Sequence, residues 1–349
     1  MSKLSGDEQG IVFAHMCNGL DPYTAVAWTS VSNELRIATQ ALMPQLKTDH
    51  EAATALCLKL GHRSCKALRE AKQVYWYFKG LTTDEFALLG TLGSVLPALK
   101  WLYLCEPAAG PNGMQQLAEG LGAGALPALI SLWISDTHVG DAGASALAAA
   151  LGQGALPRLK DLSLYSAAIG DAGLVALAPA LRRRPALERL VLYANPLGDE
   201  GLAALVAPPP PAGAPQPPTG GLATLKQLYL RGTQVTDAGC AALVTALDRG
   251  ALPALKTVVL EGTPASAAAT AAVQEALDNL ESRRADLVRS LRMEVKELRA
   301  RLNVLRGNER RPTVSWKLVE FYELAPLFVE KKQRLQRLVY TLGQVGSYW

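Results

Sequence analysis

The segments LPALKWLYL (residues 96–104), LPALISLWI (126–134) and LPRLKDLSL (156–164) repeat one pattern of leucines. Three further copies follow, PALERLVL (185–192), LATLKQLYL (222–230) and LPALKTVVL (252–260). The anchor Leu99 recurs at steps of 30, 30, 28, 38 and 30 residues, at Leu129, Leu159, Leu187, Leu225 and Leu255. In each copy the last two apolar residues stand two apart, which predicts that they share one face of a short strand.

A second pattern lies behind four of these segments. It reads VGDAGASALAAAL (139–151), IGDAGLVALAPAL (169–181), LGDEGLAALV (197–206) and VTDAGCAALVTAL (235–247). The apolar spacing changes here from two to three or four, which predicts amphipathic helices. We expect each aspartate (Asp141, Asp171, Asp199 and Asp237) to cap the first turn of its own helix. The preceding Gly140, Gly170 and Gly198 favour tight turns with positive φ.

A strand, a turn and a helix within about 30 residues cannot bury their apolar faces alone, so the copies must stack on one another. The pattern resembles the leucine-rich repeat family, in particular its ribonuclease-inhibitor-like subclass with one helix per repeat. That resemblance implies an α/β solenoid with short parallel strands on the concave face and helices on the convex face. It also implies a ladder, a row of Asn or Cys side chains three residues after the last strand leucine of each copy, that satisfies backbone groups of the loops. Only Asn195 fits this ladder fully; Thr137, Thr233 and Thr263 offer hydroxyls, and Pro107 and Ala167 offer none.

Three regions follow from this pattern. We expect a helical N-terminal region (1–95), six leucine-rich repeats (96–280) and a basic helical tail (281–349). A proline-rich insertion, 207–219, explains the 38-residue step between the fourth and fifth copies. It is either a tolerated insertion at a helix-to-strand junction or a polyproline ligand for an SH3- or WW-type domain.

The residues that flank the strand leucines should point out from the concave face. Trp, Tyr and Arg are the side chains that most often carry binding energy at protein interfaces. We therefore predict a partner-binding surface on this face. The alternative for some of the rings is a purely structural role, in which they cover the strand backbone. Its candidate residues are Trp101, Tyr103, Trp133, Asp161, Tyr165, Arg189, Tyr193, Tyr229, Arg231 and Glu261.

The N-terminal region lacks the leucine pattern, and its apolar spacing predicts helices, including 38–60 and 67–78. Within it, residues 10–36 run from an apolar helix through a Leu-Asp-Pro turn to a second short helix. This layout resembles a divergent F-box, which implies docking of a ubiquitin-ligase adaptor. The implied contacts are Ile11, Val12, Phe13, Leu20, Asp21, Pro22, Val26, Trp28 and Leu35. The competing interpretation is a helical cap that seals the first repeat. Both interpretations can hold together.

The tail begins as a helix that continues from residue 266 past Leu280. Apolar residues alternate three and four apart from Val288 to Leu305, and residues 283–311 hold ten Lys/Arg against four Asp/Glu. Three roles compete for this basic helix: a C-terminal cap on the repeats, a helix for a partner or for self-association, and binding to nucleic acid or another anionic surface. The final stretch predicts an amphipathic helix pair broken at Pro326.

The composition restricts the chemistry. The formal net charge is +4, which argues weakly against a general nucleic-acid binder. Four histidines and five scattered cysteines show no metal-ligand or disulfide spacing, and no catalytic motif is present. No membrane span or secretory signal is apparent, so we expect a cytoplasmic or nuclear protein without a cofactor, a metal or enzymatic activity.

The sequence therefore predicts a non-catalytic protein-binding module that holds a protein partner on its concave face. One version is a substrate receptor of a cullin-type ubiquitin ligase. The alternative is a stand-alone scaffold or inhibitor that occludes a partner, as ribonuclease-inhibitor-like proteins do. A weaker third possibility is an assembly or cytoskeletal subunit held by its tail helices.

Overall fold

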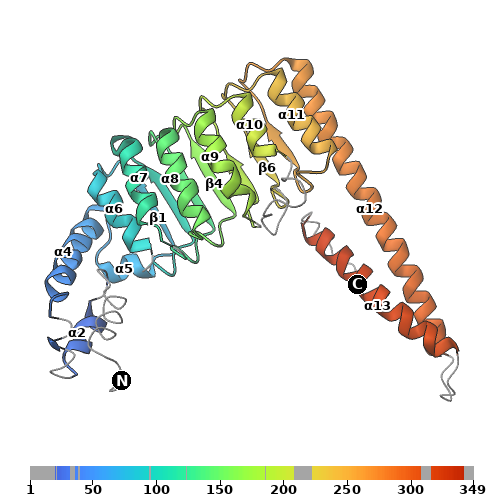
Figure 1. The fold of residues 1–349 in the computed structure, drawn as a ribbon, viewed down its shortest axis with the longest axis horizontal. Helices are drawn as coiled ribbons and strands as arrows, with labels where there is room; N and C mark the ends of the chain where they lie inside the picture. Colours follow the sequence, from blue (N-terminus) through green and yellow to red (C-terminus); the bar gives the residue numbers. More distant parts are fainter. Residues whose placement is uncertain are drawn as a thin grey trace.

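The computed structural model describes residues 20, 22–31, 36–37, 40–93, 96–122, 124–184, 186–207, 222–307 and 316–341. The described strands form one parallel sheet in chain order (Figure 1). Its strands are β1 (Gln73–Tyr77), β2 (Trp101–Cys105), β3 (Ser131–Ser135), β4 (Asp161–Tyr165), β5 (Arg189–Val191), β6 (Gln227–Tyr229) and β7 (Thr257–Val259).

One helix follows each strand, and these helices lie side by side along one side of the sheet (Figure 1). They are α6 (Thr83–Leu92), α7 (Gly110–Gly120, after the 3-10 turn η2, Pro107–Ala109), α8 (Gly140–Gly152), α9 (Asp171–Arg182), α10 (Asp199–Val206), α11 (Asp237–Asp248) and α12 (Ala267–Gly307). Among the described residues, the sheet is preceded by the helices α2 (Tyr23–Thr29), α4 (Met43–Lys59) and α5 (Cys65–Glu70). The last described helix is α13 (Trp316–Thr341).

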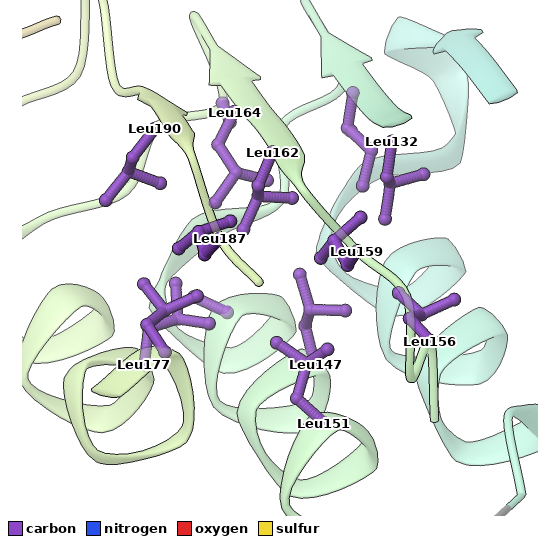
Figure 2. Packing of buried hydrophobic residues seen from close by; sticks show 14 of the residues in the cluster. Leu132, Leu147, Leu151, Leu156, Leu159, Leu162, Leu164, Leu177, Leu187 and Leu190 are labelled. Carbon is purple, nitrogen blue, oxygen red and sulfur yellow. The ribbon is translucent and has the colours of Figure 1, made fainter. Parts of the chain in front are cut away.

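The core lies between the sheet and this helix layer. Figure 2 shows the strand leucines Leu162, Leu164 and Leu190 pointing toward Leu147, Leu151 and Leu177 of α8 and α9. All six are at most 2 % exposed. The anchor leucines at residues 99, 129, 159, 187, 225 and 255 are buried as well. The prediction that the paired leucines of each segment face the core is thus confirmed, with Val258 and Leu260 as the last such pair.

The prediction of a helix over residues 67–78 is wrong in part. This segment holds the short helix α5 and then strand β1, which pairs with β2 in the register Val74 to Leu102 and Trp76 to Leu104. Val74 and Trp76 are buried while Gln73, Tyr75 and Tyr77 are exposed, so the period is two and not three or four. With α6 this strand makes a further strand–helix unit ahead of the six predicted ones.

The aspartates of the GDxG pattern do not cap their own helices. Asp171 Oδ1 instead accepts hydrogen bonds from the amides of Gly198 (2.7 Å) and Gly201 (2.8 Å), at the start of the next helix, α10. Asp141 serves α9 in the same way, and Asp199 serves α11. The reason is position: Asp171 is the first residue inside its helix, not the residue before it, so its carboxylate reaches the neighbouring unit.

The second glycine of the GDxG patterns at 170–173 and 198–201 makes room for that aspartate. A Cβ on Gly201 would lie 2.8 Å from Asp171 Oδ1, and a Cβ on Gly173 would lie 2.5 Å from Asp141 Oδ1. The first glycine has positive φ only at Gly140 (φ +61°). The positive φ expected at Gly170 and Gly198 is wrong, because both have negative φ and lie against the aspartate oxygens of the preceding unit.

A second set of polar contacts ties the turns that follow the strands. Asn195 is 2 % exposed; its Oδ1 accepts from the amides of Ala167 (3.1 Å) and Ile169 (3.0 Å), and its Nδ2 donates to the carbonyl of Leu164 (2.7 Å). The Thr137 hydroxyl accepts from the amide of Glu106 at 3.0 Å. In the β2 unit, Glu106 rather than the predicted ladder position Pro107 takes this role, because its buried carboxylate accepts from the amides of Lys79, Gly80 and Leu81.

Helix α12 closes the array and then leaves it. Val273, Ala276, Leu277 and Leu280 belong to the same core cluster as the repeats, so α12 runs unbroken across the predicted boundary at residue 281. Beyond that point Val288 and Leu291 pack against Leu335 of α13, which runs beside α12 (Figure 1). Lys331 and Glu294 join the two helices by a 2.7 Å ion pair.

The predicted break at Pro326 is wrong. Helix α13 is continuous from Trp316 to Thr341 with Pro326 inside it. Proline in a helix interior removes one hydrogen bond and costs about 3 kcal/mol. The contacts of α13 with α12 on the C-terminal side of Pro326 can offset that cost, since Leu335 is buried and Val339 packs in the same cluster.

The Asp–Gly contact predicts a coupled pair of substitutions. Asp171→Ala should lower the free energy of unfolding by about 1–2 kcal/mol, the usual cost of a lost helix cap. Gly201→Ala should destabilise the intact protein but cost at least about 0.5 kcal/mol less in the Asp171→Ala background, where the oxygen that meets the new Cβ is gone. Urea unfolding of the four proteins measures this coupling, and strictly additive losses would contradict it.

The contacts of Asn195 predict a larger loss in the free energy of unfolding. Asn195→Ala leaves buried backbone groups of two turns without partners, so we expect a loss of about 2–4 kcal/mol in the free energy of unfolding. Thr233→Val is the matched control, because the Thr233 hydroxyl donates only to the Leu230 carbonyl of its own turn. Its loss should be about 1 kcal/mol or less by the same measurement. Equal losses at the two sites would refute a bridging role for Asn195.

Candidate binding face on the sheet

The face of the sheet opposite the helix layer carries the side chains that alternate with the core leucines. We call it the strand face. The strands β2 and β3 show this alternation: Leu102, Leu104, Leu132 and Ile134 are buried, whereas Trp101, Tyr103 and Trp133 are half-buried. The parallel register then places equivalent residues of successive strands side by side, as in the row Tyr75, Tyr103 and Trp133.

These three residues form a continuous aromatic row. The rings of Tyr75 and Tyr103 are stacked with centroids 4.6 Å apart, and Tyr103 and Trp133 lie 5.4 Å apart. Tyr77 adds a fourth ring, 6.0 Å from Tyr75. Burial, and then the neighbouring Tyr75, raise the pKa of Tyr103, so its hydroxyl stays protonated at neutral pH and can donate a hydrogen bond. The row is an apolar strip edged with phenol donors.

Asp161 ends this strip and orients the tryptophan. Its Oδ2 accepts from Trp133 Nε1 and from the Ser131 hydroxyl, both at 3.2 Å. An Arg189 guanidinium nitrogen lies 3.7 Å from the same oxygen, and Arg189 Nε donates to Gln227 Oε1 at 2.8 Å. Four strands are thereby linked across the strand face, and the indole is fixed before any partner arrives.

A second aromatic group lies farther along the array. Tyr193 and Tyr229 meet edge to face with centroids 5.4 Å apart. Burial, and then Tyr229, raise the pKa of Tyr193. Arg231 and Glu261 form a 3.7 Å ion pair beside them and are mostly exposed. An exposed pair of this kind contributes little to stability, so both side chains remain free to exchange partners.

The edge where the strands begin is lined by charges. Glu188 accepts from Lys160 (3.1 Å) and from Lys226 (2.8 Å), the equivalent residues of the units on either side. Burial alone would raise the pKa of Glu188, but the hydrogen bonds from Lys226 and Lys160 outweigh it and lower the pKa. This carboxylate therefore stays ionised near neutral pH and holds both lysines in place.

All ten predicted partner-binding residues lie on the strands of this face or within two residues of their ends. Trp101, Tyr103, Trp133, Asp161, Arg189, Tyr193 and Tyr229 are half-buried, while Tyr165, Arg231 and Glu261 are exposed. The structure brings Tyr103, Trp133, Asp161 and Arg189 into one group, and it places Tyr193 beside Tyr229 and Arg231 beside Glu261 farther along the array. It adds Tyr75 and Tyr77, which sequence reasoning missed; the alternation in QVYWY was the signal that could have found them.

The residues predicted to contact a ligase adaptor are only partly described. Ile11, Val12, Phe13, Asp21 and Leu35 lie outside the described residues. Leu20 is 3 % exposed and belongs to the core cluster of α4 and the repeats. Trp28 packs with Ala25 and Leu46 in a cluster between α2 and α4, and Pro22 is half-buried. Val26, by contrast, is 46 % exposed.

Within the described ranges, no cluster of three or more His, Cys, Asp or Glu side chains could hold a metal ion. Cys57, Cys65, Cys105 and Cys240 are buried free thiols, and burial followed by contact with Cys65 raises the pKa of Cys57 to about 12. None of the helices in the described segments is long and apolar enough to cross a bilayer. The arginines and lysine at 289, 292, 296, 299 and 301 are exposed on α12.

The comparisons with known proteins agree with this geometry. A family profile described as "Leucine Rich repeat" matches residues 127–148, which span β3 and most of α8. The same profile matches residues 221–244, which span β6 and the first two turns of α11. A comparison with curated proteins found no match. Together with the parallel sheet and its helix layer, the two profile matches support a leucine-rich-repeat protein.

Proposed function

We propose that this chain is a non-catalytic protein-binding module and that a protein partner occupies the strand face, which the sequence predicts to be concave. One observation carries the proposal: outward-facing rings and charges run across the strands in contact with one another, although the core of the array does not need them. Leucine-rich repeats generally mediate protein–protein interaction, which supports the same role.

The composition and rigidity of the face favour a protein over a small molecule. Trp, Tyr and Arg dominate it, and these residues are enriched where binding energy concentrates at interfaces. The rings of Tyr75 and Tyr103 are already stacked and Trp133 is held by Asp161. Binding of a partner therefore costs this chain little side-chain entropy. Charges at Asp161, Arg189, Arg231 and Glu261 can give orientation to a partner that buries the rings.

Between the two specific versions, the placement of Leu20 favours a stand-alone scaffold or inhibitor. The ligase-receptor version needs the segment 20–22 as an exposed unit separate from the repeats. Leu20 instead is buried and belongs to the same core cluster as Ala53 and Leu56 of α4 and the repeats. The ligase version retains one supporting feature, since Tyr23 (80 %) and Val26 (46 %) are exposed on α2.

The strand-face proposal predicts a selective loss of binding. Tyr165→Ala combined with Trp133→Ala should weaken partner binding by more than about 1 kcal/mol. Val175→Ala is the matched control, because Val175 is a partly exposed apolar residue on the helix side of the array. Partners recovered by affinity purification and quantified by mass spectrometry provide the measurement. Unchanged recovery with the double variant, or equal loss with Val175→Ala, would contradict the proposal.

The scaffold and ligase-receptor versions predict different partners for a chain that lacks its N-terminal segment. The full chain and a chain lacking residues 1–40 should recover the same partners without a ligase adaptor or cullin if the scaffold version holds. Because the deletion also removes the buried Leu20, the full-length variant Tyr23→Ala with Val26→Ala serves as a control that leaves the core intact. Recovery of adaptor and cullin by the full chain, lost in both variants, would establish the receptor version instead.

A further inference from the structure

Within the described segments, the first strand of the sheet, β1, is paired along one edge only. In a parallel sheet, alternate residues direct their N–H and C=O groups to opposite neighbours. The amide of Phe78 donates to the Cys105 carbonyl (2.9 Å), and the carbonyl of Lys72 accepts from the Trp101 amide (3.1 Å). Even-numbered residues of β1 therefore pair with β2, and Gln73, Tyr75 and Tyr77 direct both backbone groups away from the sheet.

Nothing in the described part of the chain pairs with the outer edge of β1. β2 is the one described strand that pairs with β1, and the backbone groups of Gln73, Tyr75 and Tyr77 form no hydrogen bond with any described residue. The other end of the sheet differs, since β7 has three residues and only Val258 among them directs its backbone groups outward by the same alternation. The edge of β1 offers three such residues in a row.

The edge is also shaped to receive an extended chain. Its five residues, QVYWY, are rich in aromatic and β-branched side chains and carry no charge that would repel an added strand. Tyr75 and Tyr77 are 48 % and 44 % exposed, and Phe78, directly after the strand, is 73 % exposed. Phe78 also adopts a left-handed conformation (φ +51°), which is uncommon for so bulky a residue.

The charge at both ends of β1 selects the chemistry of the added strand. Lys72 precedes the strand and is exposed, and Lys79 follows it. Glu106, which contacts the backbone at Lys79, is buried and already accepts from three amides, and Glu70 is paired with Lys66. Neither carboxylate is therefore committed to an ion pair with Lys72 or Lys79. Burial, and then Tyr103 and Tyr75, raise the pKa of Tyr77, which keeps its hydroxyl as a donor. The edge thus presents cations and donors to an acceptor-rich chain.

We propose that β1 accepts an acidic, extended segment of a partner protein as an added strand of the sheet. Backbone hydrogen bonds to Gln73, Tyr75 and Tyr77 would hold the segment, and carboxylates at its ends would meet Lys72 and Lys79. This site is the edge of the sheet rather than the strand face, although Tyr75 and Tyr77 contribute their rings to both. It can therefore be tested apart from the proposed function.

Amide exchange of the full chain tests whether the edge is open. By NMR, the amides of Tyr75 and Tyr77 should exchange with solvent far faster than those of Trp76 and Phe78, which face β2. Slow exchange at all four would overturn the proposal, because the edge would then be covered by another part of this chain, such as residues 1–19, or by a second copy. Repeating the measurement at several protein concentrations separates those two causes.

Peptide selection tests the occupant. Random peptides displayed on phage, selected on the full chain, should converge on extended sequences rich in Asp and Glu. Tyr75→Pro removes an outward N–H without touching the β1–β2 ladder, a position where edge strands tolerate proline. It should weaken the selected peptide at least about tenfold relative to Tyr75→Val, which loses the same ring but keeps the N–H. Equal affinity for the two variants would overturn the proposal.

Two further measurements keep the test decisive if Tyr75→Pro fails to fold. Methylation of alternate backbone nitrogens of the selected peptide should abolish binding in one register and spare it in the other, whereas a peptide seated on the strand face would show no such alternation.

Lys72→Glu with Lys79→Glu should weaken binding of the acidic peptide about tenfold and reduce the salt dependence of that binding. Neutral or basic peptides as the selected class would overturn the assignment of an acidic segment.

Discussion

From α8 to α12 the array depends on a carboxylate that one unit places at the helix start of the next. Asp171 does not stabilise the helix in which it stands; it accepts from the amides of Gly198 and Gly201, which would otherwise begin α10 without a partner. The glycine at the second amide is required because the aspartate occupies the space where a Cβ would be. The starts of α9 to α12 are therefore complete only when the preceding unit is present, and these units fold as a stack rather than one by one.

This dependence separates the two faces of the sheet. The helix side holds the leucine core and the aspartate contacts, so most of its positions are constrained in both size and chemistry. The strand face takes no part in either set of contacts. Side chains there can be chosen for binding, which explains how rings and charges gather in register on strands of otherwise uniform sequence.

The sequence determines more of the stack than of its ends. Six units were predictable because leucine fills the anchor and both inward strand positions almost without exception. The unit at β1 was not, because Ala71, Val74 and Trp76 stand at the equivalent positions and only their spacing of three and two is kept. The aspartates were predicted at helix starts but assigned to the wrong helix, since a sequence gives position along a helix and not the neighbour that a side chain reaches.

The same limit applies to the candidate site. The outward positions of the strands follow from the alternation, so the ten residues of the strand face could be named from the sequence. Their mutual contacts could not: the bond from Trp133 to Asp161 joins residues of two strands, and the Tyr75–Tyr103 stack needs β1 to be recognised first. In the tail, the helix through Pro326 was missed because packing against α12, which the local pattern does not contain, outweighs the missing backbone bond.

The two ends of the array are closed in different ways, and this difference has a physical cause. At the C-terminal end α12 supplies buried residues to the core and β7 is short, so little backbone is left to pair. At the N-terminal end α4 and α5 contribute Leu56, Cys57 and Leu68 to the buried cluster that also holds Val74 and Trp76 of β1, whereas the outward backbone of β1 lies at the edge of the sheet. A helix can cover apolar side chains, but only an extended chain can satisfy a row of strand N–H and C=O groups. Closing the core therefore leaves the edge of β1 as the place where another chain can continue the sheet.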